Sequence, residues 1–246
     1  MRLALNDRLF VLTGAGISAE SGLATFRGSG GLWNGYRVED VATPEAWRTD
    51  PELVWRFYSM RRRDALAAQP NAGHIAIAEI EQKLADRFYL CTQNVDDLHE
   101  RAGSQRIHHM HGTLFQSRCV HCNATFPDKA LYEAAVKLPK CPKCGALVRP
   151  HIVWFGEVPL DMEDIYRELD RTTILLVVGT SGSVYPAAGF VQVANQRGIR
   201  TSTSVRRNRS TLTHSMRLFW ARRQRSCRPS LGRIVRTHNW SSTGRK

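Results

Sequence analysis

Three short apolar runs dominate the hydrophobic pattern of the chain, and each is followed at once by small or polar residues. They are Arg8–Thr13, Arg87–Thr92 and Thr173–Val178. Runs this short and this continuously apolar are typical of strands buried on both faces of a sheet. Helical patterns over residues 51–68 and 73–85 lie between them. This alternation predicts an α/β fold with a doubly wound parallel Rossmann-like sheet, whose ligand binds beyond the carboxyl ends of the strands.

The helical segment 51–68 carries clear signals at its start. Asp50 is a favoured N-cap residue, and Pro51 suits the first helical position. An apolar stripe at i, i+4 and i+7 spacing follows, made of Leu53, Phe57 and Met60. Tyr58 and Arg61 are three residues apart, so we expect them to share a face beside that stripe.

Four cysteines lie in residues 115–150, where the regular periodicity stops. They form two Cys-x2-Cys pairs with 18 residues between them, Cys119 with Cys122 and Cys141 with Cys144. This is the spacing of a tetrahedral four-thiolate zinc ribbon. Two disulfides are the alternative, but the N-terminal residues show no secretory h-region, so we expect a cytoplasmic chain with reduced thiols. We therefore predict a small inserted zinc-ribbon module with one structural zinc, because four thiolates leave no open coordination position.

The net charge of +13 is concentrated at one end of the chain. Residues 201–246 contain eleven Arg, one Lys and no acidic residue, whereas residues 1–200 have a net charge of only +1. The overall basicity is therefore a poor guide to the function of the body. The zinc ribbon and the basic tail keep nucleic-acid binding open as an alternative function. No apolar run reaches the roughly 18 residues of a membrane span, so we expect no membrane partner.

The first apolar run ends in a glycine turn, Gly14–Ala19, that fits the pattern G-x-G-x-x-A. Such a turn lets the backbone approach a pyrophosphate group. The acidic residue that usually follows on a second strand about 20 residues later is not evident. The chain continues instead as a polar, glycine-rich loop, Glu20–Trp33, and long loops in compact domains are usually functional. We interpret the segment as a dinucleotide site that differs from the dehydrogenase pattern.

Three histidines precede Gly112, namely His108, His109 and His111. An imidazole with its ordinary pKa of about 6.5 suits a general base at neutral pH. Isolated histidines are more often structural than catalytic. Spacing alone therefore leaves both roles open for His111.

Several long motifs occur together and in one order: Thr13–Arg27, Thr92–Asp96, His109–Gly112, the four cysteines, Val153–Glu157 and Gly179–Ser181. In these motifs the chain resembles the sirtuins, a family of NAD-dependent protein deacylases, across residues 8–200. The pair Tyr58-x-x-Arg61 further resembles the class III sirtuins, which remove succinyl and malonyl groups from lysine.

The resemblance implies roles for individual residues. His111 matches the general base of the family, and Asn94 and Asp96 complete the catalytic set. The residues that would contact NAD are Gly14, Ala15, Gly16, Ser18, Glu20, Gly22, Thr25, Phe26, Arg27, Trp33, Gln93, Asn94, Asp96, Gly179, Thr180 and Ser181. An acylated protein substrate would add a strand between two segments and meet Tyr58 and Arg61 with its acyl group. These segments are Val153, Trp154, Phe155, Gly156 and Glu157 on one side and Gly182–Tyr185 on the other.

The resemblance also implies the reaction. The acyl-lysine oxygen attacks the ribose carbon that bears nicotinamide, and His111 then deprotonates a ribose hydroxyl. The products are lysine, nicotinamide and O-acyl-ADP-ribose, so NAD is consumed. We expect a desuccinylase and demalonylase with weaker deacetylase activity, unless Arg61 belongs to a solvated run, Arg61–Arg63. Protein ADP-ribosyl transfer from the same pocket is an alternative.

The motifs also suggest how the chain is divided. The expected parts are a Rossmann-like NAD-binding domain (residues 1–50, 73–114 and 151–200), a helical insertion of the small domain (51–72) and the zinc-ribbon module (115–150). In the family an apolar strand and an adenine-binding loop follow residue 200. Here Thr201–His214 is polar and basic, so we expect no such strand. A shifted reading frame near codon 201 would explain the atypical Arg/Ser/Thr-rich tail, 201–246; an Arg-rich amphipathic tail is the alternative.

Overall fold

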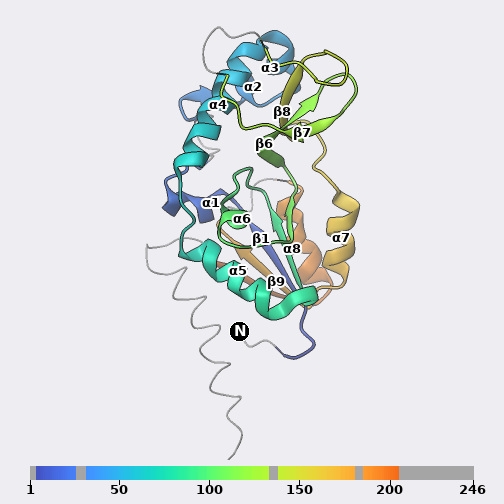
Figure 1. Ribbon diagram of the computed structural model, residues 1–246. Helices are drawn as coiled ribbons and strands as arrows, with labels where there is room; N and C mark the ends of the chain where they lie inside the picture. Colours follow the sequence, from blue (N-terminus) through green and yellow to red (C-terminus); the bar gives the residue numbers. More distant parts are fainter. Residues whose placement is uncertain (1–3, 26–31, 133–137, 181–184, 205–246) are drawn as a thin grey trace, which may run out of the picture.

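The computed structural model describes residues 4–25, 32–132, 138–180 and 185–204. Figure 1 shows a sheet lobe and, above it, a small lobe of helices and short strands. The sheet lobe contains β1 (Leu9–Thr13), α1 (Ala15–Ser18), the 3-10 turns η1 (Ala19–Ser21) and η2 (Ala85–Arg87), α5 (Ala72–Leu84), β4 (Phe88–Thr92), α6 (Leu98–Arg101), β5 (Ile107–His109), α7 (Met162–Asp170), β9 (Ile174–Val178), α8 (Ala187–Gln196) and β10 (Arg200–Ser204). The small lobe contains β2 (Leu32–Trp33), β3 (Tyr36–Arg37), α2 (Val38–Val41), α3 (Pro44–Thr49), α4 (Pro51–Ala67), β6 (Gly112–Cys119), β7 (Thr125–Pro127) and β8 (Val148–Ile152).

The sheet lobe is built on one parallel sheet with the strand order β10-β9-β1-β4-β5. Leu9 of β1 pairs with Phe88 of β4 on one side and with Ile174 of β9 on the other. The predicted parallel sheet of Rossmann type is therefore confirmed, and the three apolar runs are adjacent strands within it. One buried cluster, with α5, covers one face of the sheet, and a second, with α7 and α8, covers the other (Figure 1).

The strand after residue 200 is present, and the expectation that it is missing was wrong. β10 runs parallel to β9, and in the register Thr201 lies opposite Leu175. The side chains of β10 are exposed or half-buried. Its formation depends on backbone hydrogen bonds to β9, and threonine is a favourable strand residue even where it is not buried. The rest of the basic segment, 205–246, lies outside the described residues, so both interpretations of the tail remain predictions.

Helix α4 organises the small lobe. It begins as predicted, with Pro51 in the first turn and with Asp50 Oδ1 accepting a backbone N–H at 2.8 Å. The predicted apolar stripe of α4, Leu53, Phe57 and Met60, packs into one core with residues of β6 and β8. Helices α2 and α3 contact α4 and contribute to the same core.

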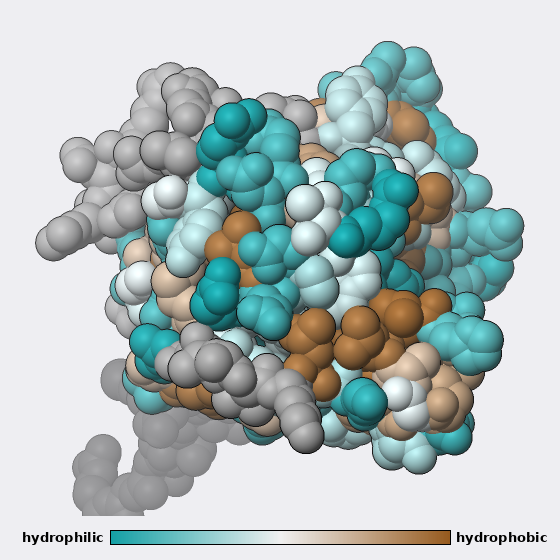
Figure 2. All heavy atoms as spheres, turned by 90° about the horizontal axis from the view of Figure 1, so that it is seen from above, coloured by the Kyte–Doolittle hydropathy of each residue, from teal (hydrophilic) through white to brown (hydrophobic). Residues whose placement is uncertain are grey.

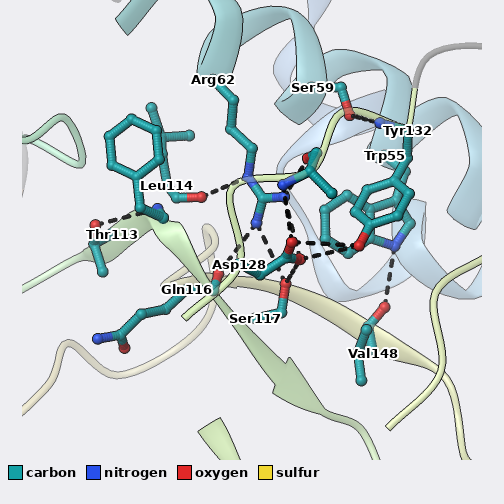
Figure 3. Close-up of polar contacts among 12 residues, drawn as sticks. Trp55, Ser59, Arg62, Thr113, Leu114, Gln116, Ser117, Asp128, Tyr132 and Val148 are labelled. Carbon is teal, nitrogen blue, oxygen red and sulfur yellow. Dashed lines mark hydrogen bonds and ion pairs between the residues drawn. The ribbon is translucent and has the colours of Figure 1, made fainter. Parts of the chain in front are cut away.

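A buried arginine joins α4 to the strands beside it (Figure 3). The side chain of Arg62 is 0% exposed, and its Nη1 lies 3.2 Å from Asp128 Oδ2. Arg62 Nε also donates to the backbone carbonyl of Leu114 at 2.6 Å. The hydroxyls of Ser117 and Tyr132 donate to the same Asp128 carboxylate. This network fixes the orientation of α4, which also carries Tyr58 and Arg61.

Hydrophilic side chains cover much of the described surface seen from above, and several apolar side chains on this face lie side by side in a band (Figure 2). Among the described residues, no helix combines the length and the apolar character needed to cross a membrane.

Candidate functional site

The carboxyl ends of β1, β4 and β9 bring three loops together at one edge of the sheet. The Gln93 N–H donates to the carbonyl of Thr13 at 2.9 Å, which joins the loops after β4 and β1. The Gly16 N–H donates to the carbonyl of Gly179 at 2.7 Å, which joins the loops after β1 and β9. The polar motifs at the ends of the predicted strands therefore form one continuous site.

Close contact between these loops explains two of the glycines. Gly179 has a φ of +66°, and a Cβ on it would collide with the backbone nitrogen of Ile17. A Cβ on Gly16 would lie 2.6 Å from the Gly179 carbonyl oxygen. Any side chain at either position would separate the two loops.

A buried hydroxyl connects the glycine turn to the loop Gln93–Asp96, called the β4 loop below. Ser18 Oγ lies 3.0 Å from Asn94 Nδ2 and 3.1 Å from Asp96 Oδ2. Because the amide nitrogen donates and the carboxylate accepts, Ser18 accepts the first hydrogen bond and donates the second. Burial raises the pKa of Asp96, and hydrogen bonds from the Leu98 N–H and from Ser18 oppose that rise.

His74 completes this network, and sequence reasoning missed it. Its Nδ1 accepts the backbone N–H of Asn71 at 3.2 Å, so the proton is on Nε2, which faces Ser18 Oγ at 3.4 Å. Burial lowers the pKa of His74 to about 4, and the ring is neutral at pH 7. Asn71 is a favoured N-cap residue and could have marked this helix start. The contact of His74 with Ser18, in contrast, is set by tertiary packing.

His111 lies beside the β4 loop in the form that a general base requires. Its Nδ1 is 3.2 Å from the carbonyl oxygen of Gln93. A carbonyl only accepts, so Nδ1 carries the proton and Nε2 keeps a lone pair. Burial lowers the pKa of His111, against the effect of this hydrogen bond, so the ring is neutral at pH 7. Gly112 follows with a φ of +78°, and a Cβ there would collide with the His151 carbonyl.

Tyr58 and Arg61 lie one turn apart on α4, and Arg61 stacks on the Trp33 ring. The Arg61 guanidinium carbon is 3.8 Å from the centre of the Trp33 ring. Burial raises the pKa of Tyr58 to about 12 and lowers that of Arg61 to about 10. Within the described residues, Arg61 Nη1 is buried and has no hydrogen-bond partner. A buried charged donor without an acceptor is costly, and this atom can pair with an anionic group.

The three consecutive arginines of α4 have three different environments. Arg61 stacks on Trp33, Arg62 is fully buried against Asp128, and Arg63 is exposed. The alternative of one solvated run is therefore wrong for Arg61 and Arg62. Helix geometry rotates consecutive residues by about 100°, which directs the three side chains to different surroundings.

The segment Val153–Glu157 passes beside His111. The Val153 N–H donates to the His111 carbonyl at 2.9 Å. Phe155 is 44% exposed, and Gly156 has a φ of +89°. This segment therefore presents two exposed residues, Phe155 and Gly156, close to the candidate base.

The side chains of Trp154 and Glu157 are engaged within the protein. The Trp154 ring N–H donates to the Tyr58 hydroxyl at 3.1 Å, and Trp154 is 2% exposed. Glu157 forms a salt bridge of 2.6 Å with Arg149, whose guanidinium lies 3.6 Å from the Trp154 ring centre. Trp154 thus connects the segment to the Tyr58 side chain.

The remaining residues expected at the cofactor lie around the same loops, with one exception. Ala15 opens α1, Glu20 is exposed in η1, and Gly22 follows with a φ of +91°. Thr25 and Thr180 are half-buried in the loops after η1 and β9. Trp33 instead packs in the small lobe, on Arg61. Outside the described residues lie Phe26, Arg27, Ser181 and the positions 182–184.

The four cysteines of the two pairs meet in one cluster. Their Sγ atoms all lie within 4.8 Å of one another, and three of the separations are 3.5, 3.7 and 3.6 Å. A zinc ion about 2.3 Å from four tetrahedral sulfurs sets these separations at about 3.8 Å. None of the four is in a disulfide. The cluster fits a structural zinc, which Cys119, Cys122, Cys141 and Cys144 would hold.

Comparison with known proteins agrees with this arrangement. The model of the Sir2 family matches residues 14–186. The NAD-dependent protein deacylase of Caulobacter vibrioides is 51% identical over 197 residues, which cover 79% of this chain and 82% of that protein. The enzyme of the same name from Vibrio cholerae is 51% identical over 193 residues, 78% of each chain. A crystal structure of a Sir2 homologue with NAD has a TM-score of 0.78 and 41% identity, covering 89% of this chain and 90% of that one.

The family model spans most of the chain and includes the glycine turn, the β4 loop, His111 and the four cysteines. The resemblance seen in the motifs is thereby confirmed, and the chain belongs to the Sir2 family.

Proposed function

We propose that this Sir2-family chain, an NAD-dependent protein deacylase, prefers lysine acyl groups that end in a carboxylate, succinyl and malonyl, over acetyl. The observation that carries the preference is the buried Arg61 Nη1, which has no hydrogen-bond partner among the described residues. The methyl end of an acetyl group offers this atom no acceptor. A terminal carboxylate offers two oxygens.

The energetic argument follows from burial. A carboxylate that enters an acyl pocket loses its hydration, which is costly unless a cation pairs with it. Arg61 supplies a planar guanidinium, and Tyr58 supplies a hydroxyl proton beside it. Each charge-assisted hydrogen bond contributes about 1.5–3 kcal/mol, or roughly ten- to a hundredfold in discrimination. Stacking on Trp33 restrains the guanidinium plane and so reduces the entropy lost when a ligand binds.

The residues of the β4 loop and His111 carry the reaction. NAD, bound as co-substrate, supplies the ADP-ribosyl group that accepts the acyl group. Asn94 and Asp96, held by Ser18, present an amide and a carboxylate for orienting ribose and carboxamide groups. His111 Nε2, with its free lone pair, takes the proton of a ribose hydroxyl. The reaction consumes one water, which allows the lysine amine to leave, and releases lysine, nicotinamide and O-acyl-ADP-ribose.

The test compares three peptides that differ only in the acyl group on lysine: succinyl, malonyl and acetyl. Mass spectrometry of the peptides after incubation with enzyme and NAD gives kcat/KM for each. Arg61→Met should lower desuccinylation and demalonylation by roughly ten- to a hundredfold relative to deacetylation. The matched control is Arg63→Met, an exposed arginine of the same helix, which should keep the wild-type ratios. Equal loss of all three activities in Arg61→Met would refute the acyl pocket.

Product analysis also decides between deacylation and ADP-ribosyl transfer. With NAD labelled in the adenosine half, deacylation places the label on O-acyl-ADP-ribose. Label on protein would support transfer to protein instead.

A further inference from the structure

Two histidines at the end of β5 extend the sheet pairing into the β4 loop. The Met110 N–H donates to the Thr92 carbonyl at 3.1 Å. The next two carbonyls after Thr92 face histidine side chains. His111 Nδ1 lies 3.2 Å from the Gln93 carbonyl, and His109 Nδ1 lies 2.9 Å from the Asn94 carbonyl. Alternate side chains therefore bond to consecutive carbonyls of the loop.

The second nitrogen of His109 identifies its charge state. Nε2 lies 2.7 Å from Glu100 Oε1, while Nδ1 faces the Asn94 carbonyl. A carboxylate and a carbonyl both accept, so the ring satisfies both only when both nitrogens carry protons. Burial lowers the pKa of His109, but the hydrogen bond and the charge of Glu100 outweigh it, so the pKa is raised. His109 is thus an imidazolium, unlike the neutral His111 two residues later.

We propose that His109, charged by its ion pair with Glu100, is a positioning residue that holds the Asn94 backbone in the geometry needed for NAD to react. The Asn94 carbonyl receives the His109 proton, while its side-chain amide bonds to Ser18 Oγ, so both ends of the residue are held. The His109 charge also favours the ionised form of Asp96 and opposes the raising of its pKa by burial. The inference rests on the deacylase activity but not on the acyl preference.

The charged groups near His109 determine the sign of its pH dependence. Glu100 and Asp96 favour the imidazolium, and the neighbouring His99 is neutral because burial, together with the charge of His109, lowers its pKa. Above the raised pKa, a neutral His109 has a lone pair that faces either the carbonyl or the carboxylate. One of the two hydrogen bonds is then lost. Both hydrogen bonds are present at pH values below about 6.5, and one of them is lost as the pH rises through the raised pKa of His109.

The test measures kcat/KM for NAD against pH, with an acetyl-lysine and a succinyl-lysine peptide in parallel. His109→Leu should lower kcat/KM for NAD by roughly ten- to a hundredfold with both peptides. The matched control is His108→Gln, whose ring stacks on Tyr89 and contacts no carbonyl of the β4 loop. The kcat/KM of this variant for NAD should stay within about twofold of wild type, because His108→Gln removes no hydrogen bond to the β4 loop.

Glu100→Gln gives the sharper discrimination. A neutral His109 can donate to the Asn94 carbonyl and accept an amide N–H from Gln, which preserves the geometry without the charge. This variant should keep its kcat/KM at neutral pH and lose the alkaline decline assigned to His109. The proposal is overturned if folded His109→Leu keeps wild-type kcat/KM for NAD, or if Glu100→Gln keeps the wild-type decline. If His109→Leu does not fold, the Glu100→Gln profile decides alone, and the ratio of the two peptides tests the acyl preference separately.

Discussion

Removing the charge of Asp128 should destabilise the small lobe far more than the loss of an ordinary salt bridge. The Arg62 side chain is 0% exposed and that of Asp128 is 7% exposed. In Asp128→Asn the guanidinium keeps neutral acceptors, among them the carbonyls of Leu114 and Ala130 at 2.6 and 2.7 Å, but it loses its counter-charge. Breaking a buried ion pair by removing one partner costs about 3–5 kcal/mol. For a chain of this size that lowers Tm by roughly 6–20 °C.

The measurement is thermal and urea unfolding followed by circular dichroism, with peptide kinetics on the same samples. The control is Arg48→Met, because the pair of Arg48 with Glu45 is 70% and 71% exposed. Exposed pairs contribute about 0–1 kcal/mol, so this variant should unfold close to wild type. A double variant, Arg62→Met with Asp128→Asn, measures the coupling between the two side chains. The reasoning is refuted if Asp128→Asn destabilises no more than Arg48→Met.

Three further predictions concern the base, the metal and the tail. His111→Ala should fold normally and abolish deacylation; activity within a few-fold of wild type would exclude it as the base. Because burial lowers the pKa of His111, its neutral form persists on acidification, and the acid limb of kcat should lie below pH 6.5. Removing zinc with a strong chelator should unfold the zinc module and abolish activity, since four-thiolate sites contribute folding energy directly; unchanged activity after proven metal loss would contradict this. Finally, resequencing the DNA near codon 201 and translating the other two frames tests the shifted reading frame. If neither frame yields an apolar strand followed by a family-like ending, the tail is a genuine segment.

Local pattern was sufficient for the parts of the molecule whose formation depends on nearby residues. The runs ending at Thr13, Thr92 and Val178 are strands because continuous apolar residues need burial on both faces. The cysteine spacing was sufficient to predict the cluster, since a four-thiolate site requires two short turns with paired ligands. The start of α4 followed from Asp50 and Pro51, which act within one helical turn.

Polarity misled the sequence reading where backbone pairing decided the outcome. β10 forms although its residues are polar, because β9 offers a free row of backbone partners to the chain that follows α8. The hydropathy of side chains indicates which of them are buried. It does not indicate where backbone hydrogen bonds between two strands will form.

The tertiary structure alone assigned different roles to residues of the same kind. Arg61, Arg62 and Arg63 are the same residue type, yet Arg61 lies on an aromatic ring, Arg62 pairs with a buried carboxylate and Arg63 is exposed. His109 and His111 are likewise alike in the sequence, but Glu100 makes the first a cation and burial keeps the second neutral. Charge state and hydrogen-bond role depend on which distant groups fold against a side chain, and that contact is made only when the whole chain has packed.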